Sequence, residues 1–277
     1  TIDVGTGGED RPGERVEGRQ RYPSWSTDGA FVRFWNCPPR AACAWREVGT
    51  RRGSARILDV TGRPAWSRDD TRIAFVRRDS IFVRPADGGE PELLGVHVVS
   101  FLSLHSLAWS PDGRFIAYVN GNPEWRYSPN EASSSIWILD TNGGEPVAVT
   151  DETTMNMSPQ WLPDSQHLLF ISDRDGARGV YVVEVGAGGP RGSARRVPGP
   201  SDPHSISISA DGRKLAYAKF TVKQNIWSVP ISRSGPVSIS EAEPVTQGSQ
   251  LIETQDMSPD GEWIEYESTL RGEFGGI

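Results

Sequence analysis

A five-residue turn pattern, Trp-Ser-x-Asp-Gly, recurs along the chain and constrains its fold more than any other feature. Its six copies, some of them degenerate, begin 41 to 52 residues apart. They occupy residues 25–29, 66–70, 109–113, 161–165, 208–212 and 257–261. A period in this range, with strand-like sequence in each unit, is typical of a β-propeller. Because each such unit buries its faces only against its neighbours, we expect residues 1–277 to form a single all-β domain.

The third unit serves as a template for one blade. Its four strand candidates alternate with turns and occupy residues 107–109, 114–119, 136–140 and 146–150. The last two are joined by Asn142-Gly143-Gly144-Glu145, where glycines supply the positive φ angles of a hairpin. The Gly-Gly-Glu sequence returns at 88–90 and 7–9. Helical periodicity is absent, so the sequence predicts four-stranded antiparallel blades.

The turn motif has a structural explanation in every copy. We expect the Trp to pack between blades, the Ser and Asp to cap free backbone amides, and the Gly to adopt the left-handed conformation. A catalytic role for the six aspartates is the alternative. It is disfavoured because a structural repeat needs these residues in every unit, whereas an active site needs them once.

The two ends of the chain fit together as parts of one unit. Residues 1–9 are typical of a third strand and its turn, and residues 257–277 of the first two strands of a blade. Joining them leaves 45 residues between positions 257 and 25, inside the observed range. We therefore predict a six-bladed propeller whose sixth blade is closed by both termini. The same terminal strands could instead complete a blade of a second copy, giving a homo-oligomer or filament.

Composition excludes two classes of partner. The net charge is −7 and the basic residues are scattered, which argues against nucleic-acid binding. Membrane insertion is also not expected, because no stretch approaches the ~20 apolar residues of a membrane helix.

The only two cysteines, Cys37 and Cys43, flank a tight loop between two strand candidates. Opposed positions of an antiparallel hairpin lie within disulfide range, so we predict a local bridge; two reduced thiols are the alternative. Two cysteines alone do not make a metal site. A bridge favours an oxidising compartment, such as the periplasm or the cell exterior.

The repeat resembles that of the TolB-like propellers. The resemblance is carried by Trp-Ser-Pro-Asp-Gly-Arg-Phe-Ile-Ala-Tyr at 109–118 and Ile-Trp-Ile-Leu-Asp-Thr-Asn-Gly-Gly-Glu at 136–145, and it covers essentially the whole chain. It implies the fold more strongly than a function. Such repeats serve periplasmic scaffolds, sensor domains of bacterial kinases, and gating propellers of prolyl oligopeptidase relatives and tricorn-type proteases.

Blade topology separates two faces. The uniform turns between strands one and two and between strands three and four lie on one, here called the turn face. The irregular connections lie on the other, here called the loop face, which is the candidate binding surface. They are residues 36–44, 95–106, 120–135, 151–160, 199–205 and 247–255.

We expect the loop-face ends of the first strands to form the mouth of a central funnel. The candidate binding residues there are Arg21, Tyr22, Arg63, His105, Asn156, His204 and Glu253. Such a ring could hold a peptide terminus, an acidic ligand or a metal; a solvated rim is the other interpretation. Two histidines from separate blades are thin evidence for a metal, and we predict none.

Two further features stand out. Trp125, Arg126 and Tyr127 lie in an insertion and are residue types common in interface hot spots, so a partner contact there competes with local packing. Arg33 and Glu265 replace apolar residues in the second strands of the first and sixth blades, and we expect their charges to offset each other across the seam.

Sequence signatures of common enzymes are absent. Neither Gly-x-Ser-x-Gly, His-Glu-x-x-His, a phosphate-binding glycine loop nor Cys-x-x-Cys occurs. We therefore predict a non-catalytic scaffold that binds protein or peptide and needs no cofactor. The alternative is the gating or sensor propeller of a larger peptidase or sensor kinase. A third possibility is an enzyme that uses the funnel, resembling the propeller polysaccharide lyases.

Overall fold

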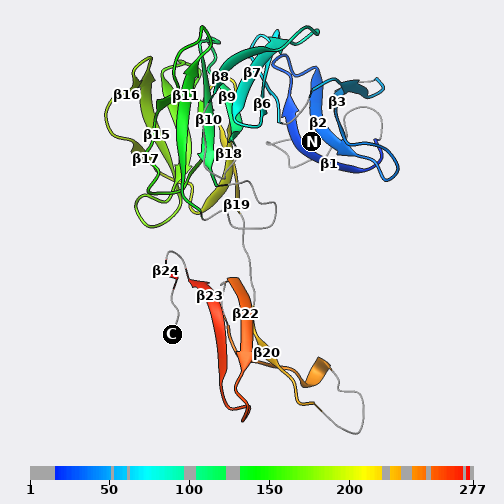
Figure 1. Cartoon of the computed structure of the whole chain (residues 1–277), viewed down its shortest axis with the longest axis vertical. Coiled ribbons are helices and arrows are strands. Elements are labelled where there is room, and N and C mark those ends of the chain that lie inside the picture. The colour runs from blue at the N-terminus through cyan, green and yellow to red at the C-terminus, as the bar shows by residue number, and fades with distance from the viewer. Residues whose placement is uncertain are drawn as a thin grey trace.

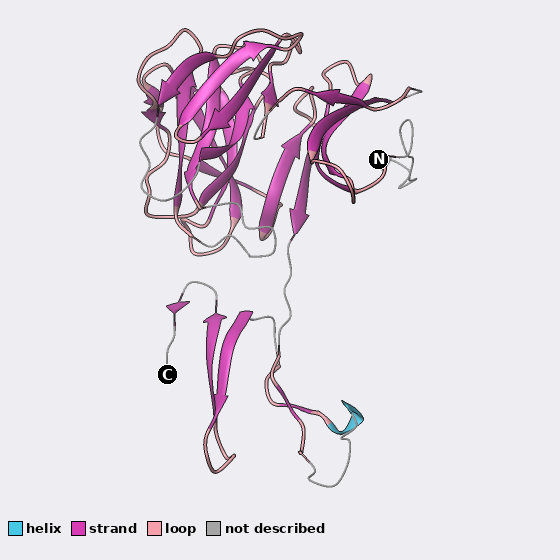
Figure 2. Cartoon of the chain, turned by 45° about the vertical axis from the view of Figure 1, so that its right-hand side comes forward, coloured by secondary structure: helices cyan, strands magenta, loops and turns pink. Residues whose placement is uncertain are grey.

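The computed structural model confirms that the chain is all-β (Figures 1 and 2). It describes residues 16–50, 53–60, 63–96, 104–122, 132–219, 225–231, 239–247, 251–270 and 273–274. Within these residues every regular element is a strand, apart from the short 3-10 helix η1 (Ile239–Glu241).

The first four sequence units form four antiparallel sheets. The first three have four strands paired in chain order, and the fourth has five strands. Blade 1 contains β1 (Arg19–Trp25), β2 (Phe31–Cys37), β3 (Ala44–Gly49) and β4 (Arg56–Leu58). Blade 2 contains β5 (Ala65–Trp66), β6 (Arg72–Arg77), β7 (Ser80–Pro85) and β8 (Glu92–Val96). Blade 3 contains β9 (Leu104–Trp109), β10 (Phe115–Gly121), β11 (Ser134–Asp140) and β12 (Val147–Ala148). Blade 4 contains β13 (Asn156–Trp161), β14 (His167–Ser172), β15 (Gly179–Gly186) and β17 (Arg195–Val197), with β16 (Gly189–Pro190) paired to the end of β15.

The last two units are less complete. In the fifth, β18 (Pro203–Ile208) pairs with β19 (Leu215–Lys219), whereas β20 (Trp227–Ser228) pairs with β21 (Glu243–Pro244) in a separate sheet. In the sixth, β22 (Leu251–Met257), β23 (Ile264–Leu270) and β24 (Glu273–Phe274) form a three-stranded sheet. Figure 1 shows β20 and β22–β24 apart from the first four blades. Residues 1–9 lie outside the described residues, so six blades and closure by both termini stay predictions.

The central strands of blade 3 are apolar on both sides because this blade is covered by two neighbours. On β10, Phe115, Ala117 and Val119 face blade 4 and share a buried cluster with Trp161 and Phe170. The alternate residues face blade 2: Ile116 packs with Ala74 and Trp109, and Tyr118 packs with Ile81. Each large apolar side chain buried in this way contributes roughly 1.5–3 kcal/mol, so face-to-face stacking of blades is the main stabilising contact.

Trp109 and Trp161, the motif tryptophans of blades 3 and 4, pack between blades as predicted, and each also forms a hydrogen bond there. The indole Nε1 of Trp109 donates to the carbonyl of Ala65 at 2.9 Å, and that of Trp161 donates to the carbonyl of Ala108 at 3.1 Å. Each acceptor immediately precedes the motif Trp of the previous blade. These two rings are 8% and 5% exposed, whereas Trp25 is 55% exposed.

The rest of the motif forms the predicted capped turn. In the first copy, Ser26 Oγ donates to Asp28 Oδ1 at 2.7 Å, and Asp28 Oδ1 accepts from the amide of Ala30 at 2.9 Å. The same pattern recurs in the turns of Ser67, Ser110, Ser209 and Ser258. In the second copy, the Ser67 hydroxyl and then the Thr71 amide lower the pKa of Asp69 to about 2. The carboxylates of the motif therefore stabilise the turns through hydrogen bonds.

Two turns carry a side chain where the motif has Gly. Asp70 and Ser165 adopt φ angles of 57° and 59°. Each accepts a hydrogen bond from the preceding blade's turn: Asp70 Oδ2 from the amide of Thr27 at 2.8 Å, and Ser165 Oγ from the amide of Asp112 at 3.0 Å. The left-handed conformation is costly for a side chain other than Gly, and here it is offset by a contact between blades.

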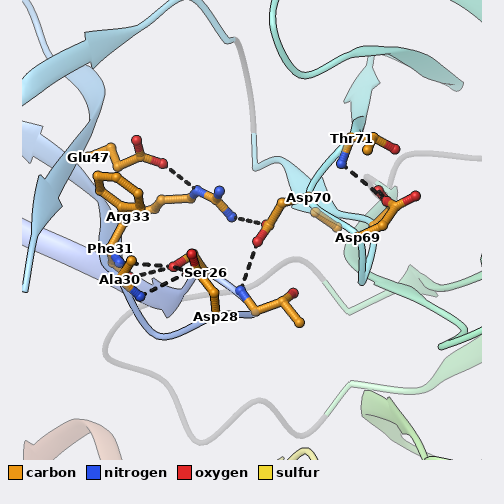
Figure 3. A network of polar contacts seen from close by, with 12 residues as sticks. Ser26, Asp28, Ala30, Phe31, Arg33, Glu47, Asp69, Asp70 and Thr71 are labelled. Carbon is orange, nitrogen blue, oxygen red and sulfur yellow. Dashed lines mark hydrogen bonds and ion pairs between the residues drawn. The ribbon is translucent and has the colours of Figure 1, made fainter.

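Arg33 is the centre of the junction between blades 1 and 2 (Figure 3). Its Nε lies 2.8 Å from Glu47 Oε2, and its Nη1 lies 2.6 Å from Asp70 Oδ1. Its Cζ also lies 4.5 Å from the ring centroid of Trp66. The expectation that Arg33 pairs with Glu265 was therefore wrong, because two carboxylates in its own and the next blade already neutralise the buried guanidinium.

We predict that Asp70→Gly lowers the free energy of unfolding by about 2 kcal/mol, because a hydrogen bond to a charged group contributes about 1.5–3 kcal/mol and two are lost. Because Gly adopts the left-handed conformation without strain, the substitution also regains part of the lost free energy of unfolding. The matched control is Ser165→Gly, which removes one neutral bond and should change stability by less than about 1 kcal/mol. Urea denaturation measures both, and an Asp70→Gly variant as stable as the wild type would contradict the role given to this junction.

Candidate functional site

The first strands of blades 2, 3 and 4 and of the fifth unit lie side by side. The first strands of neighbouring blades contact one another, β5 with β9, β9 with β13, and β13 with β18. Three of them have a bulge with a left-handed residue three positions before the motif Trp: Tyr22, Ser106 and Ser158, with φ angles of 54°, 53° and 54°. Bulges re-aim side chains, so these positions shape the loop-face ends of the inner strands. We call these ends the inner-strand rim.

Tyr22 and Arg63, two of the predicted rim residues, meet across the junction of blades 1 and 2. The guanidinium Cζ of Arg63 lies 3.5 Å from the centroid of the Tyr22 ring, a cation–π contact. Burial lowers the pKa of Arg63, and the group stays protonated at neutral pH because the pKa of a guanidinium starts far above it. The rim therefore carries a partly desolvated positive charge at this point.

His105, on β9, is buried and its imidazole is held on both sides. Nε2 lies 3.0 Å and 2.9 Å from the carbonyl oxygens of Gly121 and Asn122, so this nitrogen carries the hydrogen. Nδ1 lies 2.8 Å from the hydroxyl of Ser106. Burial, with a smaller contribution from the charge of Arg63, lowers the pKa of His105. The ring is therefore neutral near pH 7 and fixes the start of the connection that follows β10.

Asn156, on β13, is fully buried and ties the start of blade 4 to blade 3. Its Nδ2 donates to the carbonyl oxygens of Ser134 and Thr154 at 2.8 Å and 3.0 Å. Its Oδ1 accepts from Arg174 Nη2 at 3.1 Å. Both polar atoms of the Asn156 side chain therefore have hydrogen-bond partners within the protein. A contact between Asn156 and a ligand stays a prediction, and these bonds do not support it.

The remaining predicted residues are placed as follows. His204 is half-buried on β18, where burial and then the nearby charge of Arg178 lower its pKa. Glu253 lies within β22, and its side chain is not among those described. Trp125, Arg126 and Tyr127 lie outside the described residues.

The predicted disulfide is present. Cys37 and Cys43 are joined by a bond of 2.11 Å, with their Cα atoms 4.1 Å apart. The bridge closes the loop between β2 and β3 on the loop face. The bridge restricts the conformation of residues 36–44. This irregular segment is the one closest in sequence to the rim residue Arg21, which pairs with Trp35 across β1 and β2.

Two serines that sequence reasoning passed over complete the rim. Ser106 contacts Nδ1 of His105, and Ser158 Oγ accepts from the amide of Ile206 at 3.1 Å, which links β13 to β18. The signal was available, because both serines stand three residues before a motif Trp.

Two classes of site find no candidate among the described residues. Within residues 16–274, masked gaps aside, no group of three or more His, Cys, Asp or Glu residues is arranged to hold a metal ion. In the same part of the chain, no helix is long and apolar enough to cross a membrane.

Comparison with known proteins gives a consistent picture. The family described as TolB beta propeller domain matches residues 63–274. Among curated proteins, the uncharacterized peptidase YuxL of Bacillus subtilis is 26% identical over 170 residues, covering 58% of this chain and 22% of that protein. The Tol-Pal system protein TolB of Alcanivorax borkumensis is 33% identical over 129 residues, covering 44% of this chain and 27% of that protein. The chain thus spans about a quarter of the length of these relatives.

Solved structures agree on the fold. A putative TolB from Agrobacterium tumefaciens superposes with a TM-score of 0.56 at 18% identity, covering 90% of this chain and 80% of that chain. A chain of the nidogen/laminin complex superposes with a TM-score of 0.52 at 12% identity, covering 71% of this chain and 70% of that chain.

We predict that His105 makes the protein less stable below neutral pH. Because the folded state lowers the pKa of His105, the unfolded chain binds more protons once the pH falls below about 6.5. Stability is then complete above that pH and is lost as the pH falls toward the folded-state pKa. His105→Gln should therefore lose less stability than the wild type between pH 7.0 and 5.0 in urea denaturation. His167→Gln, which removes a histidine from an outer turn, is the control and should keep the wild-type loss; equal losses in all three proteins would contradict the prediction.

Proposed function

The chain belongs to the TolB β-propeller family, and from this premise we propose that it is a non-catalytic propeller that binds a protein or peptide on its loop face. The observation that carries the proposal is the difference between the two faces. On the turn face, the hydroxyl and carboxylate groups of the motif are engaged in hydrogen bonds within the capped turns. On the loop face lie the bulged inner strands, the disulfide-closed loop and the Tyr22–Arg63 contact.

The relatives support a protein partner and an extracytoplasmic location. Two of them are TolB proteins, and one of these is named as part of the Tol-Pal system. The Cys37–Cys43 disulfide suits an oxidising compartment, since cytosolic thiols are kept reduced. We therefore propose that the protein acts in the periplasm or outside the cell.

A second candidate function is a gating or sensor propeller within a larger enzyme. It is favoured by the similarity to the peptidase YuxL, of which this chain matches only 22%. The full reading frame distinguishes the two. A hydrolase or kinase domain in frame would favour this second function, whereas a signal peptide with no further domain favours the free-standing scaffold.

We also propose that the ring closes with six blades, the sixth covering blade 1. The face of blade 1 that carries Val32, Phe34 and Val48 is turned away from blade 2, because Arg33 points toward blade 2. On that same side, both amide atoms of Asn36 and the Nε of Arg46 are buried without hydrogen-bond partners. Buried polar groups are rarely left unpaired, so this face is suited to receive another sheet.

The exposed ring of Trp25 indicates where the sixth blade would attach. In blades 3 and 4, the motif indole donates to the carbonyl preceding the previous motif position. By the same rule, Trp25 would donate to the carbonyl of Asp256, on β22. The sixth blade can come from the same chain or, by strand exchange, from a second copy.

We predict that Trp25→Ala lowers the free energy of unfolding by about 3–5 kcal/mol, as for a buried aromatic residue, because the sixth blade covers the ring. The control Leu93→Ala, at an exposed position of β8 in blade 2, should change it by less than about 0.5 kcal/mol. If Trp25→Ala is as mild as the control, the sixth blade does not cover blade 1. Light scattering after size exclusion then separates the two sources of that blade: a 30.4 kDa particle indicates closure within one chain, and a multiple of that mass indicates exchange.

We predict that a partner is contacted from the loop face. A photo-crosslinking amino acid at Arg40 or Glu152, exposed on the loop face, should give a discrete adduct in cells of the source organism. The same substitution at Asn142 or Arg213, exposed in capped turns, is the matched control and should give none. Mass spectrometry of the adduct identifies the partner. Adducts from the turn-face positions alone would contradict the proposed binding face.

A further inference from the structure

Arg21 lies on the side of blade 1 that faces blade 2. It is paired across β1 and β2 with Trp35, and paired residues share a face of the sheet. The Trp35 ring is in edge contact with Trp45, and Trp45 with Trp66 of blade 2, with centroids 6.0 Å apart in both cases. Because Arg21 opens the inner strand on the loop-face side, its guanidinium belongs to the rim at the junction of the two blades.

The guanidinium of Arg21 has a hydrogen-bond donor that no described residue satisfies. Its Nη1 is buried and has no hydrogen-bond partner. A guanidinium keeps its charge at all physiological pH values, so protonation change cannot relieve the cost. An unsatisfied buried donor costs about 1–3 kcal/mol, and more when it is charged. The acceptor that would offset this cost must therefore come from outside the chain or its described part.

The described residues around Arg21 add positive charge to this point. Arg63 lies on the ring of Tyr22, the residue that follows Arg21. The neighbouring rim residue His105 is buried and its ring N–H is used by the carbonyl oxygens of Gly121 and Asn122. The two carboxylates of the blade 1–2 junction, Glu47 and Asp70, are both bound to Arg33. Among the described side chains, this part of the rim is cationic, although the whole chain has a net charge of −7. Glu253, the rim residue of the proposed sixth blade, has no described side chain.

We propose that Arg21 and Arg63 form a carboxylate-binding site that anchors the C-terminal carboxylate or an acidic side chain of a bound peptide. The inference rests on the proposed function, because it assigns the recognition chemistry of the same loop face. The planar guanidinium fork matches the two oxygens of a carboxylate, and such charge-assisted bonds are about twice as strong as neutral ones. The same fork also matches a phosphate, so the test compares the two kinds of anion directly.

Nitrogen-15 NMR of arginine side chains tests the site directly. The full chain is labelled at arginine, and the Nε–Hε signals of Arg21 and Arg63 are assigned with the variants Arg21→Lys and Arg63→Lys. The probes are N-acetylglycine for a peptide terminus, propionate for an acidic side chain, N-acetylglycinamide as the uncharged match, and inorganic phosphate, all at constant ionic strength. Exposed Arg191, which is paired with Glu184, is the internal control.

We expect saturable shifts of both signals with a carboxylate, no shift with N-acetylglycinamide, and no shift of Arg191. The stronger of the two carboxylate probes identifies the source of the carboxylate in the natural ligand. Arg21→Lys should weaken binding at least tenfold, since it keeps the charge and loses the fork. Shifts that only follow those of Arg191, or tighter binding of phosphate than of either carboxylate, would overturn the proposal.

A second measurement separates a binding role from a structural one. If the Arg21 donor is reserved for a ligand, Arg21→Met should leave the melting temperature unchanged or raise it, because it removes an unsatisfied buried donor. A lower melting temperature would indicate a structural role instead. The crosslinking experiment stays independent: loop-face adducts that persist at full yield in Arg21→Met would reject the carboxylate site alone, whereas the absence of adducts in the wild type would reject the proposed function.

Discussion

The hydrogen bond from the motif indole of blades 3 and 4 to the inner strand of the preceding blade is the contact on which the arrangement of blades 2 to 4 depends. The donor is the motif Trp, and the acceptor is the carbonyl of the residue that precedes the motif Trp of the previous blade. Trp109 therefore bonds to Ala65, and Trp161 bonds to Ala108. Hydrophobic stacking alone is non-directional and would allow blades to slide. The indole N–H fixes their relative height, so that the loop-face ends of successive inner strands come together and a rim made of several blades can exist.

The periodic part of this structure was predictable because its causes are local. Ser26 and Asp28 cap amides within five residues of themselves, and the same spacing gives the same turn elsewhere. The strands of the first four units followed for the same reason. Arg33 shows the limit: its partners Glu47 and Asp70 are 14 and 37 residues away, and neither position belongs to a shared motif that marks it as a counter-charge. The pairing with Glu265 failed because charge alone does not specify geometry.

The rim residues were predicted from their position, and their chemistry was not. Counting back from the motif Trp located His105 and Asn156 on inner strands, which is a matter of period. That His105 is neutral depends on two carbonyl oxygens of the β10 connection and on burial. That Asn156 has no free atom depends on Ser134 and Arg174. Such properties arise from contacts between blades, and a single sequence does not reveal them.

Arg33 and Arg21 lie in the same blade, and their guanidinium groups differ in whether buried nitrogen atoms have hydrogen-bond partners. Arg33 is buried with two carboxylates and a Trp ring, so its charge is compensated within the fold. Arg21 has a buried nitrogen with no acceptor. A chain with 36 acidic residues does not lack carboxylates, and any inner-strand neighbour could have supplied one. An uncompensated charge lowers stability, and proteins tolerate that cost mainly where function requires it. The contrast supports the proposal that the Arg33 end of the junction is structural and that the Arg21 end binds a ligand.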